Sequence, residues 1–466
     1  MTEGGAQQEF CCQLPTANCQ LPTANCQLPT ANRSSVNMSV RSTFLRRPVF
    51  SWALYDWANS AFATTVMAGF FPLFFKQYWS AGAEATVSTF WLGMGNGVAS
   101  GVVALLAPFL GAVADRGGTR VKLLLLFTVL GVAMTAGFYW VERGDWPTAL
   151  LFYALAMVGF SGGITFLDSL LLDVADKPEF DRVSAYGYAL GYLGGGLLFL
   201  VNVMMYSQPA LFGLADGAQA IRVAFVMVAV WWAVFTVPLM LFVRERGPAT
   251  RLRPMAALRA GWRELWSTVG DLRNYRVLVL FLIAYWLYID GVNTVIKMAV
   301  DYGLALGFEA KSLITALLIT QFVGFPAALA FGWIGDRLGA RAGIMIAIVI
   351  YLGTTLWAYF LDNVAEFYAL AIIVGLVQGG IQSLSRSFFG RLVPPEKSGE
   401  FFGFFNMMGK FAAVLGPVLT GWVALSSGSS RLAILSLAIL FVAGGAVLCF
   451  VREPATSSLD PDGNSG

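Results

Sequence analysis

The sequence predicts an all-α integral membrane protein whose twelve transmembrane helices form two pseudo-symmetric six-helix halves. Three observations lead to this fold class. Hydrophobic residues make up 57% of the 466 residues and charged residues only 12%, about half of the roughly 25% found in soluble domains. Twelve apolar segments are long enough to cross a bilayer, and short motifs recur in the same order in both halves. The shortage of charge excludes a cytosolic globular enzyme, a disordered protein and a typical nucleic-acid binder.

The residue counts also restrict the chemistry of the chain. There is no histidine, which excludes a Ser-His-Asp triad, a His-ligated zinc site and an imidazole proton relay. The 30 Lys and Arg residues nearly balance the 27 Asp and Glu residues, so a polyanion would gain little from binding. No phosphate-binding P-loop is present. We therefore expect no nucleic-acid partner, no metal, no cofactor and no enzymatic activity.

The N-terminal segment, residues 1–47, is predicted to be a disordered leader. The sequence Cys-Gln-Leu-Pro-Thr-Ala-Asn occurs three times between residues 12 and 32, and four of the five cysteines lie in this leader. One interpretation is a thiolate metal site; the other is a translated DNA repeat upstream of the true start. Identical repeats indicate recent duplication and favour the second, with Met38 as the native start. A proline in each unit argues against a helix.

A membrane-spanning helix needs about 20 mainly apolar residues. The predicted spans are 50–75, 90–114, 121–141, 147–174, 185–206, 222–243, 277–300, 312–334, 342–361, 366–388, 401–424 and 431–451. Residues 48–243 then form the N-terminal half and residues 277–452 the C-terminal half. The basic segment 244–276 is predicted to be a cytoplasmic linker with a short amphipathic helix at 255–269, and residues 453–466 a disordered tail.

The distribution of positive charge orients these spans. Most of the 30 Lys and Arg residues lie on the side of the two termini and the linker, whereas the opposite side carries only Lys76, Arg143, Arg222, Lys311 and Arg431. Cytoplasmic loops are enriched in Lys and Arg. Both termini are therefore predicted to be cytoplasmic, with the chain in the plasma (inner) membrane if the source is bacterial. We expect a monomer surrounded by lipid.

Three pairs of motifs relate the two halves. The pattern G-x-x-x-D-R-x-G-x-R follows the second span and again the eighth, with its fixed positions at Gly111, Asp115, Arg116, Gly118 and Arg120, and at Gly332, Asp336, Arg337, Gly339 and Arg341. The pattern D-x-x-N occurs in spans one and seven, at Asp56 with Asn59 and at Asp290 with Asn293. Spans four and ten share a glycine-rich string, residues 158–164 and 374–381.

The two copies of G-x-x-x-D-R-x-G-x-R resemble the signature loop of the major facilitator superfamily, at the connections where that family carries it. The string Tyr55-Asp-Trp-Ala-Asn-Ser-Ala-Phe62 and the segment 288–293 resemble the vacuole-effluxer branch, whose eukaryotic members are autophagy-related vacuolar amino-acid effluxers. The resemblance covers about residues 48–452. It implies the major facilitator fold, transport of a small solute, and a role for the two loops as cytoplasmic gate latches. Alternatively, the two loops have a purely structural role and only hold neighbouring helices together.

Charged residues inside the spans are the candidates for a substrate or proton site, because burying an Asp at a helix centre costs about 2.5–3.5 kcal/mol. These residues are Asp56, Asp168, Asp290, Lys297, Arg386 and Lys410. Each D-x-x-N pair shares a helix face and forms either a site for a substrate ammonium or proton, or a polar contact between helices. Asp168 and Arg386 form either an ion pair across the cavity or a clamp for a substrate carboxylate.

Three further polar residues complete the candidates. Lys297 and Lys410 are either site residues or lysines that extend toward the membrane surface, and Gln378 is a neutral polar candidate. The absence of histidine means that any coupled proton must be carried by a carboxylate. Span five has no Gly-Pro pair of the kind that antiporters of the superfamily often carry.

The predicted function is secondary active transport of a small polar solute, with amino acids as one class, by alternating access and coupled to ions such as protons. A lipid or peptide exporter of the same fold is the alternative. An intramembrane enzyme or receptor is the rival from another class. Gly159-Phe-Ser161-Gly-Gly163 matches the G-x-S-x-G pattern of serine hydrolases, but that chemistry needs a histidine base. We therefore interpret these small residues as a helix-packing face.

Overall fold

The computed structural model describes residues 43–80, 101–102, 106–115, 118–245, 259–260, 263, 266–267 and 275–452. By its internal contacts the chain divides into a unit Met1–Thr43, of which only Thr43 is described, and a unit Phe44–Gly466, to which everything below refers. The repeat-bearing cysteines, most of span two, Arg116, most of the linker and the tail lie outside the described residues. So do the side chains of Lys297 and Lys410 within their helices.

The described residues are helical, without a β-strand. The first group, here named the N-terminal set, consists of Arg47–Ala61 (α2), Phe62–Phe70 (η1), Phe71–Phe74 (α3), Phe75–Trp79 (η2), the helix Leu106–Asp115, Arg120–Gly137 (α5), Trp146–Ser169 (α6), Leu171–Val174 (α7), Phe180–Ser207 (α8) and Gly217–Phe242 (α9). The C-terminal set consists of Arg276–Ala305 (α11), Ala310–Leu338 (α12), Ala340–Ala358 (α13), Val364–Leu392 (α14), Ser398–Ser427 (α15), Ser430–Leu435 (α16) and Ala438–Cys449 (α17).

Nine helices of the described part are long and apolar enough to cross a membrane. All twelve predicted segments contain helical residues, but the count of twelve spans stays a prediction, because spans one, two and eleven are not among these nine helices. Two segments differ from simple α-helices. Span one continues from α2 through the wider π-helical turns of η1 and η2 to Trp79, and span twelve is interrupted between α16 and α17 at Ser436 and Leu437.

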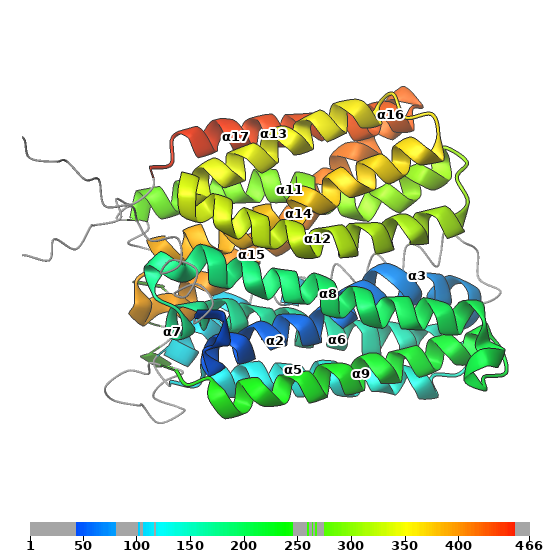
Figure 1. Cartoon of the computed structure of the whole chain (residues 1–466), viewed down its shortest axis with the longest axis horizontal. Coiled ribbons are helices and arrows are strands. Elements are labelled where there is room, and N and C mark those ends of the chain that lie inside the picture. The colour runs from blue at the N-terminus through cyan, green and yellow to red at the C-terminus, as the bar shows by residue number, and fades with distance from the viewer. Residues whose placement is uncertain are drawn as a thin grey trace, which may run out of the picture. The chain divides into compact units, whose positions relative to one another are not determined.

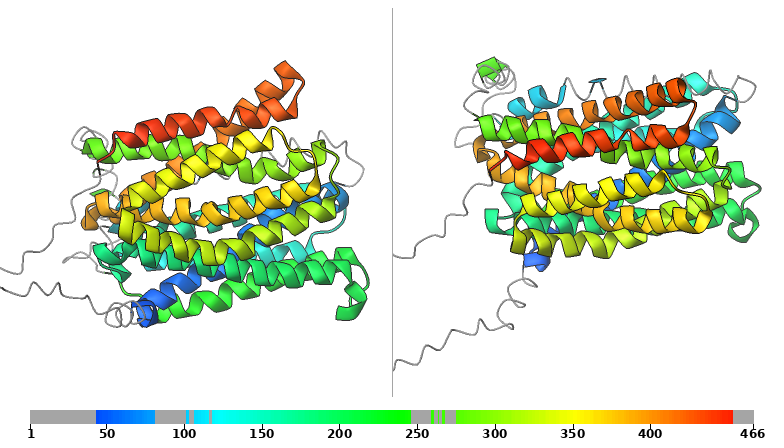
Figure 2. Two further views of the ribbon diagram at one scale, coloured as in Figure 1. Left: turned by 45° about the horizontal axis from the view of Figure 1, so that its top comes forward. Right: turned by 90° about the horizontal axis from the view of Figure 1, so that it is seen from above.

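The helices lie side by side along the horizontal axis of Figure 1, with the N-terminal set below and the C-terminal set above. Figure 2 shows the same side-by-side arrangement from two other directions. Within the sets, α5 packs on α6, α2 on α8 and α9, α12 on α14, and α11 on α15 and α17. The sets meet where α8 packs on α12 and α14, and where α6 packs on α15.

The two ends of the bundle differ in how their helix starts are capped. At the end away from the G-x-x-x-D-R-x-G-x-R loops, here called the far end, local side chains accept the first free backbone N–H groups: Asp145 for α6, Asp216 for α9 and Asn363 for α14. At the loop-bearing end, here called the motif end, α5, α13 and α15 have no such local cap, and at the far end α12 lacks one as well. Their free groups need partners from elsewhere in the fold.

The apolar core is likewise divided unevenly between the ends. One buried cluster at the motif end contains side chains of both sets, such as Trp52, Leu171, Tyr288 and Phe388. Toward the far end there are two separate clusters: one, around Phe71 and Trp232, has buried members from the N-terminal set only, and the other, around Leu361, has them from the C-terminal set only. The sets therefore share a buried core at the motif end, whereas at the far end the N-terminal cluster meets the C-terminal set, among the described apolar side chains, only through the partly buried Ile314, Leu317 and Leu318 in α12.

Small residues set the distance between neighbouring helices. In α6, a Cβ added at Gly159 would lie 2.5 Å from the backbone nitrogen of Gly131 and 2.6 Å from the carbonyl oxygen of Phe127, both in α5. These neighbours are backbone atoms, which cannot rotate away. Gly159 and Gly163 thus lie on a helix-packing face, and Ser161 between them is buried in the middle of α6.

We expect Gly159→Ala to lower the thermal midpoint of the purified protein, because the added methyl overpacks the α5–α6 contact at a cost of about 1–3 kcal/mol. The matched control is Gly353→Ala in α13, where nothing lies within 4 Å of the added Cβ; its midpoint should stay at or slightly above the wild-type value. Differential scanning fluorimetry in detergent measures both. Equal midpoints for the two variants would contradict the close approach of α5 and α6.

Candidate functional site

A cavity of about 470 Å³ lies between the two sets of helices. Its lining comes from α2, η1, α6 and α8 on one side and from α11, α12, α13, α14 and α15 on the other. It extends from Arg386, near the motif end, to Leu361 and Ile434, near the far end. Six of the predicted site residues line it: Asp56, Asn59, Asp168, Asn293, Gln378 and Arg386.

Arg386 of α14 is the centre of a buried charge cluster in the cavity wall. Its Nη1 lies 3.1 Å from Oδ1 of Asp168 in α6 and 3.3 Å from Oδ2 of Asp56 in α2. Its Nη2 donates to the carbonyl oxygen of Ser184 at 2.8 Å, and its Nε to the hydroxyl of the same serine at 2.9 Å. Both carboxylates belong to the N-terminal set, so these ion pairs join the two sets.

Aromatic rings and a glycine shape the space around this guanidinium. Its central carbon lies 4.7 Å from the ring centre of Trp52 and 4.4 Å from that of Tyr188, distances typical of cation–π contacts. A Cβ at Gly187 would lie 2.4 Å from Oδ2 of Asp56 and 3.1 Å from Nη2 of Arg386. Only glycine at position 187 therefore lets α8 approach the ion pair so closely.

Several residues of the site are absent from the sequence prediction. Asn406 of α15 donates from Nδ2 to Oδ2 of Asp168 at 3.1 Å, and Ser184, Tyr188 and Gln382 are the other polar members. Asn406 lies four residues before Lys410 and thus on the same helix face. This spacing is the sequence signal that identifies Asn406 as a candidate. Ser184 and Tyr188 lie in the segment before Gly191, where small residues suggest only packing.

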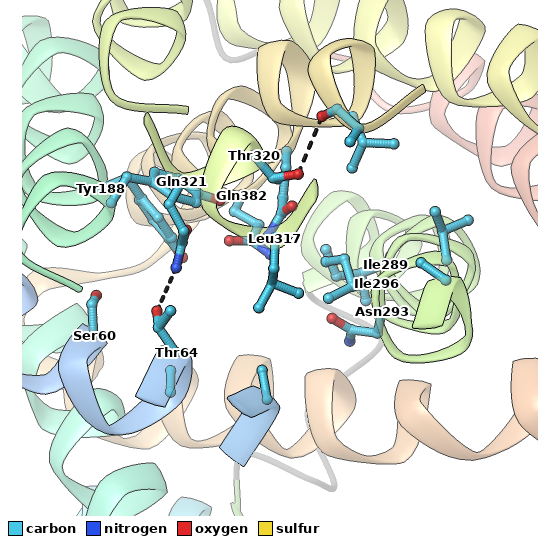
Figure 3. A pocket seen from close by; sticks show the side chains of 18 of the residues that line it. Ser60, Thr64, Tyr188, Ile289, Asn293, Ile296, Leu317, Thr320, Gln321 and Gln382 are labelled. Carbon is cyan, nitrogen blue, oxygen red and sulfur yellow. Dashed lines mark hydrogen bonds between the residues drawn. The ribbon is translucent and has the colours of Figure 1, made fainter. Parts of the chain in front are cut away.

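Across the cavity, polar side chains of the two sets also meet at the middle of the bundle. Gln321 of α12 donates from Nε2 to the hydroxyl of Thr64 in η1, as Figure 3 shows. Asn293, Ile289 and Ile296 of α11 lie on the other side of the same space. Apart from the charge cluster, the described lining consists of neutral polar, aromatic and aliphatic side chains.

Asp290 is not among the described residues that line this cavity, and its part in a substrate or proton site stays a prediction. Asp290 is fully buried in α11; its Oδ2 accepts the backbone N–H of Gly416 in α15 at 2.9 Å, and its Oδ1 lies 3.5 Å from the hydroxyl of Thr294. Residues three apart share a helix face only approximately, so Asn293 reaches the cavity and Asp290 contacts α15. Asp290 thus makes the interhelix contact that was the alternative interpretation of its role.

At the motif end, the first signature loop contacts the start of α15. Both carboxylate oxygens of Asp115 accept backbone N–H groups, from Gly399 and from Glu400, each at 2.9 Å. They supply the partners that α15 lacks locally, and a carboxylate is favoured at a helix N-terminus by the helix dipole. A Cβ at Gly111 would lie 2.1 Å from the carbonyl oxygen of Gly399, so the close contact requires glycine there.

Arg120, the last fixed residue of this loop, is buried at the centre of an ionic network. It pairs with Asp173 at 3.0 Å and with Asp115 and Glu245 at 3.8 Å, and it donates to the hydroxyl of Ser398 at the start of α15. Glu245 also accepts the backbone N–H groups of Arg120 and Val121 and so caps α5. Gly118 has a φ of 58°, the left-handed conformation that glycine allows.

The second signature loop makes the corresponding contacts with α8. Asp336 forms an ion pair with Arg182, and a Cβ at Gly332 would lie 2.6 Å from the Cβ of Ala185. Gly339 has a φ of 85°. Arg337 stacks over Trp333 at 4.1 Å, and Arg341, unlike its counterpart Arg120, donates to the carbonyl oxygen of Cys449 at 2.6 Å.

A third contact, outside the signature loops, joins the sets at the motif end. Asp181 of α8, which is buried, accepts from Arg391 of α14 at 2.6 Å and from the hydroxyl of Ser387. The motif end is therefore held together by contacts that cross between the sets, and its conformation is closed.

Comparison with known proteins agrees with this architecture. Residues 45–456 match the family described as "Vacuole effluxer Atg22 like". An "Uncharacterized MFS-type transporter YxiO" of Bacillus subtilis is 38% identical over 417 residues, which are 89% of this chain and 97% of the relative. "Autophagy-related protein 22-1" of Emericella nidulans is 28% identical over 284 residues, 56% of this chain and 47% of the relative. The chain thus spans about half the length of this fungal relative.

Two solved structures show the same fold. The human organic anion transporter MFSD10 superposes with a TM-score of 0.67 and 14% identity, covering 86% of this chain and 99% of that chain. The proton:xylose symporter XylE superposes with a TM-score of 0.65 and 14% identity, covering 90% and 97%. The fold is that of the major facilitator superfamily, a family of multi-pass membrane transporters rather than enzymes. With most of its length matched, this chain belongs to the vacuole-effluxer, Atg22-like family of that superfamily.

Proposed function

We propose that this protein is a secondary active transporter that moves a small polar solute, with amino acids as the favoured class, by alternating access. One observation carries this proposal: Arg386 of one set and Asp56 and Asp168 of the other meet in the wall of a cavity between the sets. Buried ionisable residues in a membrane protein are costly and are typical of substrate or ion pathways. A cavity of about 470 Å³ suits a small solute better than a lipid.

The uneven core supports alternating access around that cluster. Ion pairs and a shared buried core hold the motif end closed, while at the far end the buried members of each cluster come from one set only. Opening the motif end requires the contacts between Asp115 and α15 and between Asp336 and Arg182 to break. The two signature loops would therefore act as latches of a gate. The distribution of positive charge favours a cytoplasmic motif end. The closed motif end is then the cytoplasmic gate.

Amino acids are favoured because carboxylates and neutral amide side chains line the same cavity and because of the family. The relatives include autophagy-related proteins, and the family is that of the vacuole effluxers. Coupling to protons would use the carboxylates of the cluster, because the chain has no histidine. We further propose that the protein is a monomer in lipid, with two six-helix halves at 48–243 and 277–452 and a basic cytoplasmic linker between them.

We expect Asp56→Asn and Asp168→Asn each to reduce solute transport at least about tenfold, because each removes a charge that faces Arg386 in a dry environment. Uptake of a radiolabelled amino-acid mixture into proteoliposomes, with and without a pH gradient, measures this. The matched control is Asp362→Asn, whose ion pair with Arg431 lies on the exposed far end. Unchanged transport in both cluster variants would contradict the site. No transport of any amino acid, peptide or sugar by the wild type would contradict the function.

We expect Asp115→Asn to open the motif end more often, because the amide loses the charge that caps α15. A cysteine at the buried Ser398 reports the opening. It is placed in a background in which the five native cysteines are replaced by serine. Its labelling by a membrane-impermeant maleimide should speed up about tenfold with Asp115→Asn, equivalent to about 1.4 kcal/mol. Asp145→Asn, at a helix cap of the far end, is the control. Equal labelling rates in both variants would exclude a latch role for Asp115.

A further inference from the structure

The guanidinium of Arg386 has no N–H group left for a substrate. A guanidinium carries five N–H donors in a fixed plane. Nε donates to the Ser184 hydroxyl, Nη1 to Asp168 and Asp56, and Nη2 to Asp56 and the Ser184 carbonyl. All five donors therefore have acceptors within the protein.

Two aromatic rings, those of Trp52 and Tyr188, also lie against the guanidinium. Only 2% of the Arg386 side chain is exposed. A substrate carboxylate would have to displace Asp56 or Asp168 from a buried ion pair to reach it. Arg386 is thus a positioning residue, which holds the two aspartates at the cavity wall.

The charge that remains at the site is negative. Two carboxylates face one guanidinium, and Asp56 is the most exposed of the three side chains, at 12%. Both hydrogen bonds that Arg386 makes to Asp56 end at Oδ2. Within the described part of the chain, Oδ1 of Asp56 accepts no hydrogen bond, so this oxygen is open to a cationic donor from the cavity.

One turn along the same helix, Asn59 offers the complementary group. It lines the cavity, only 3% of it is exposed, and its Nδ2 has no hydrogen-bond acceptor among the described residues. An unpaired buried donor is unfavourable by about 1–3 kcal/mol, so an acceptor supplied by a ligand would bind here with a gain. Asp56 and Asn59 are three residues apart, which places their Cβ atoms about 5–6 Å from each other.

We propose that helix α2 binds the two charged groups of an α-amino acid, with the substrate ammonium at Oδ1 of Asp56 and the substrate carboxylate at Nδ2 of Asn59. This inference rests on the proposed function and specifies its substrate site. In an α-amino acid the two charged groups are attached to one carbon, a spacing that matches neighbouring residues on one helix face. Phe160, Ile164 and Ile289 line the same cavity and provide an apolar environment for the side chain.

The test uses three probes that share the isopropyl group of valine: valine itself, 2-methylpropylamine, which lacks the carboxylate, and 3-methylbutanoate, which lacks the ammonium. Calorimetric titration of the full-length protein in detergent measures their affinities. We expect valine to bind best, the amine to bind more weakly and the acid not to bind. The probes compare ligands on the unmodified protein, so this result does not depend on whether a variant folds.

Three variants then assign the groups. Asp56→Asn should lower the affinity for valine and for the amine at least about tenfold, whereas Asn59→Ala should lower that for valine only. Arg386→Lys should weaken both ligands by a similar factor, because it misplaces Asp56 without removing a carboxylate ligand. Asp362→Asn should change none of the affinities. The thermal midpoint of each variant is recorded alongside, and a variant that fails to fold leaves the probe comparison to decide.

Several results would overturn the inference. Binding of the acid as tight as that of the amine, or loss of valine affinity but not amine affinity in Arg386→Lys, would make Arg386 the carboxylate ligand. Failure of all three probes to bind would also overturn it, and the cluster would then serve a proton or another solute. Transport of such a solute by the same preparation would leave the proposed function standing, whereas absence of all transport would remove the proposed function as well.

Discussion

The buried guanidinium of Arg386 is the group on which the central part of the structure depends. A positive charge in a low-dielectric interior is strongly unfavourable unless carboxylates and hydrogen-bond acceptors surround it. The fold meets this requirement with Asp56 from α2, Asp168 from α6 and Ser184 from α8, three different helices of the N-terminal set. Because Arg386 itself belongs to α14, the requirement also fixes how the two sets face each other. The buried ion pair also requires glycine at position 187, because a side chain there would displace Asp56 from Arg386.

Two helices at the motif end take their caps from residues elsewhere in the fold. The free N–H groups at the start of α15 bind Asp115, and those at the start of α5 bind Glu245. A helix capped by a residue of its own sequence keeps that cap in every conformation. A helix capped from the opposite set keeps it only while the two sets are together. The far-end caps at Asp145, Asp216 and Asn363 are of the first kind, and Asp115 is of the second.

Much of the architecture follows from the sequence because lipid imposes a simple length rule. The fold class and family could be predicted from apolar segments and from the repeated signature loop, and Asp168 and Arg386 could be placed at nearly equal depths in equivalent helices. Sequence spacing could not show that Asp56, 330 residues from Arg386, joins them. Nor could it separate Asp290 from Asn293, because a difference of about 60° around a helix decides whether a side chain meets a cavity or a neighbouring backbone. Asn406 and Ser184 depend on packing that no local pattern encodes.

The π-helical turns of η1, just beyond Asp56 and Asn59, have a mechanical consequence. In a π-helix each hydrogen bond encloses one residue more than in an α-helix, as the bond from Phe71 to the carbonyl of Val66 illustrates. Rewinding one such turn to α-helical geometry would rotate everything after it by about 100° relative to everything before it. A change of this kind would rotate the residues beyond η1, including Trp79, relative to Asp56 and Asn59 in α2.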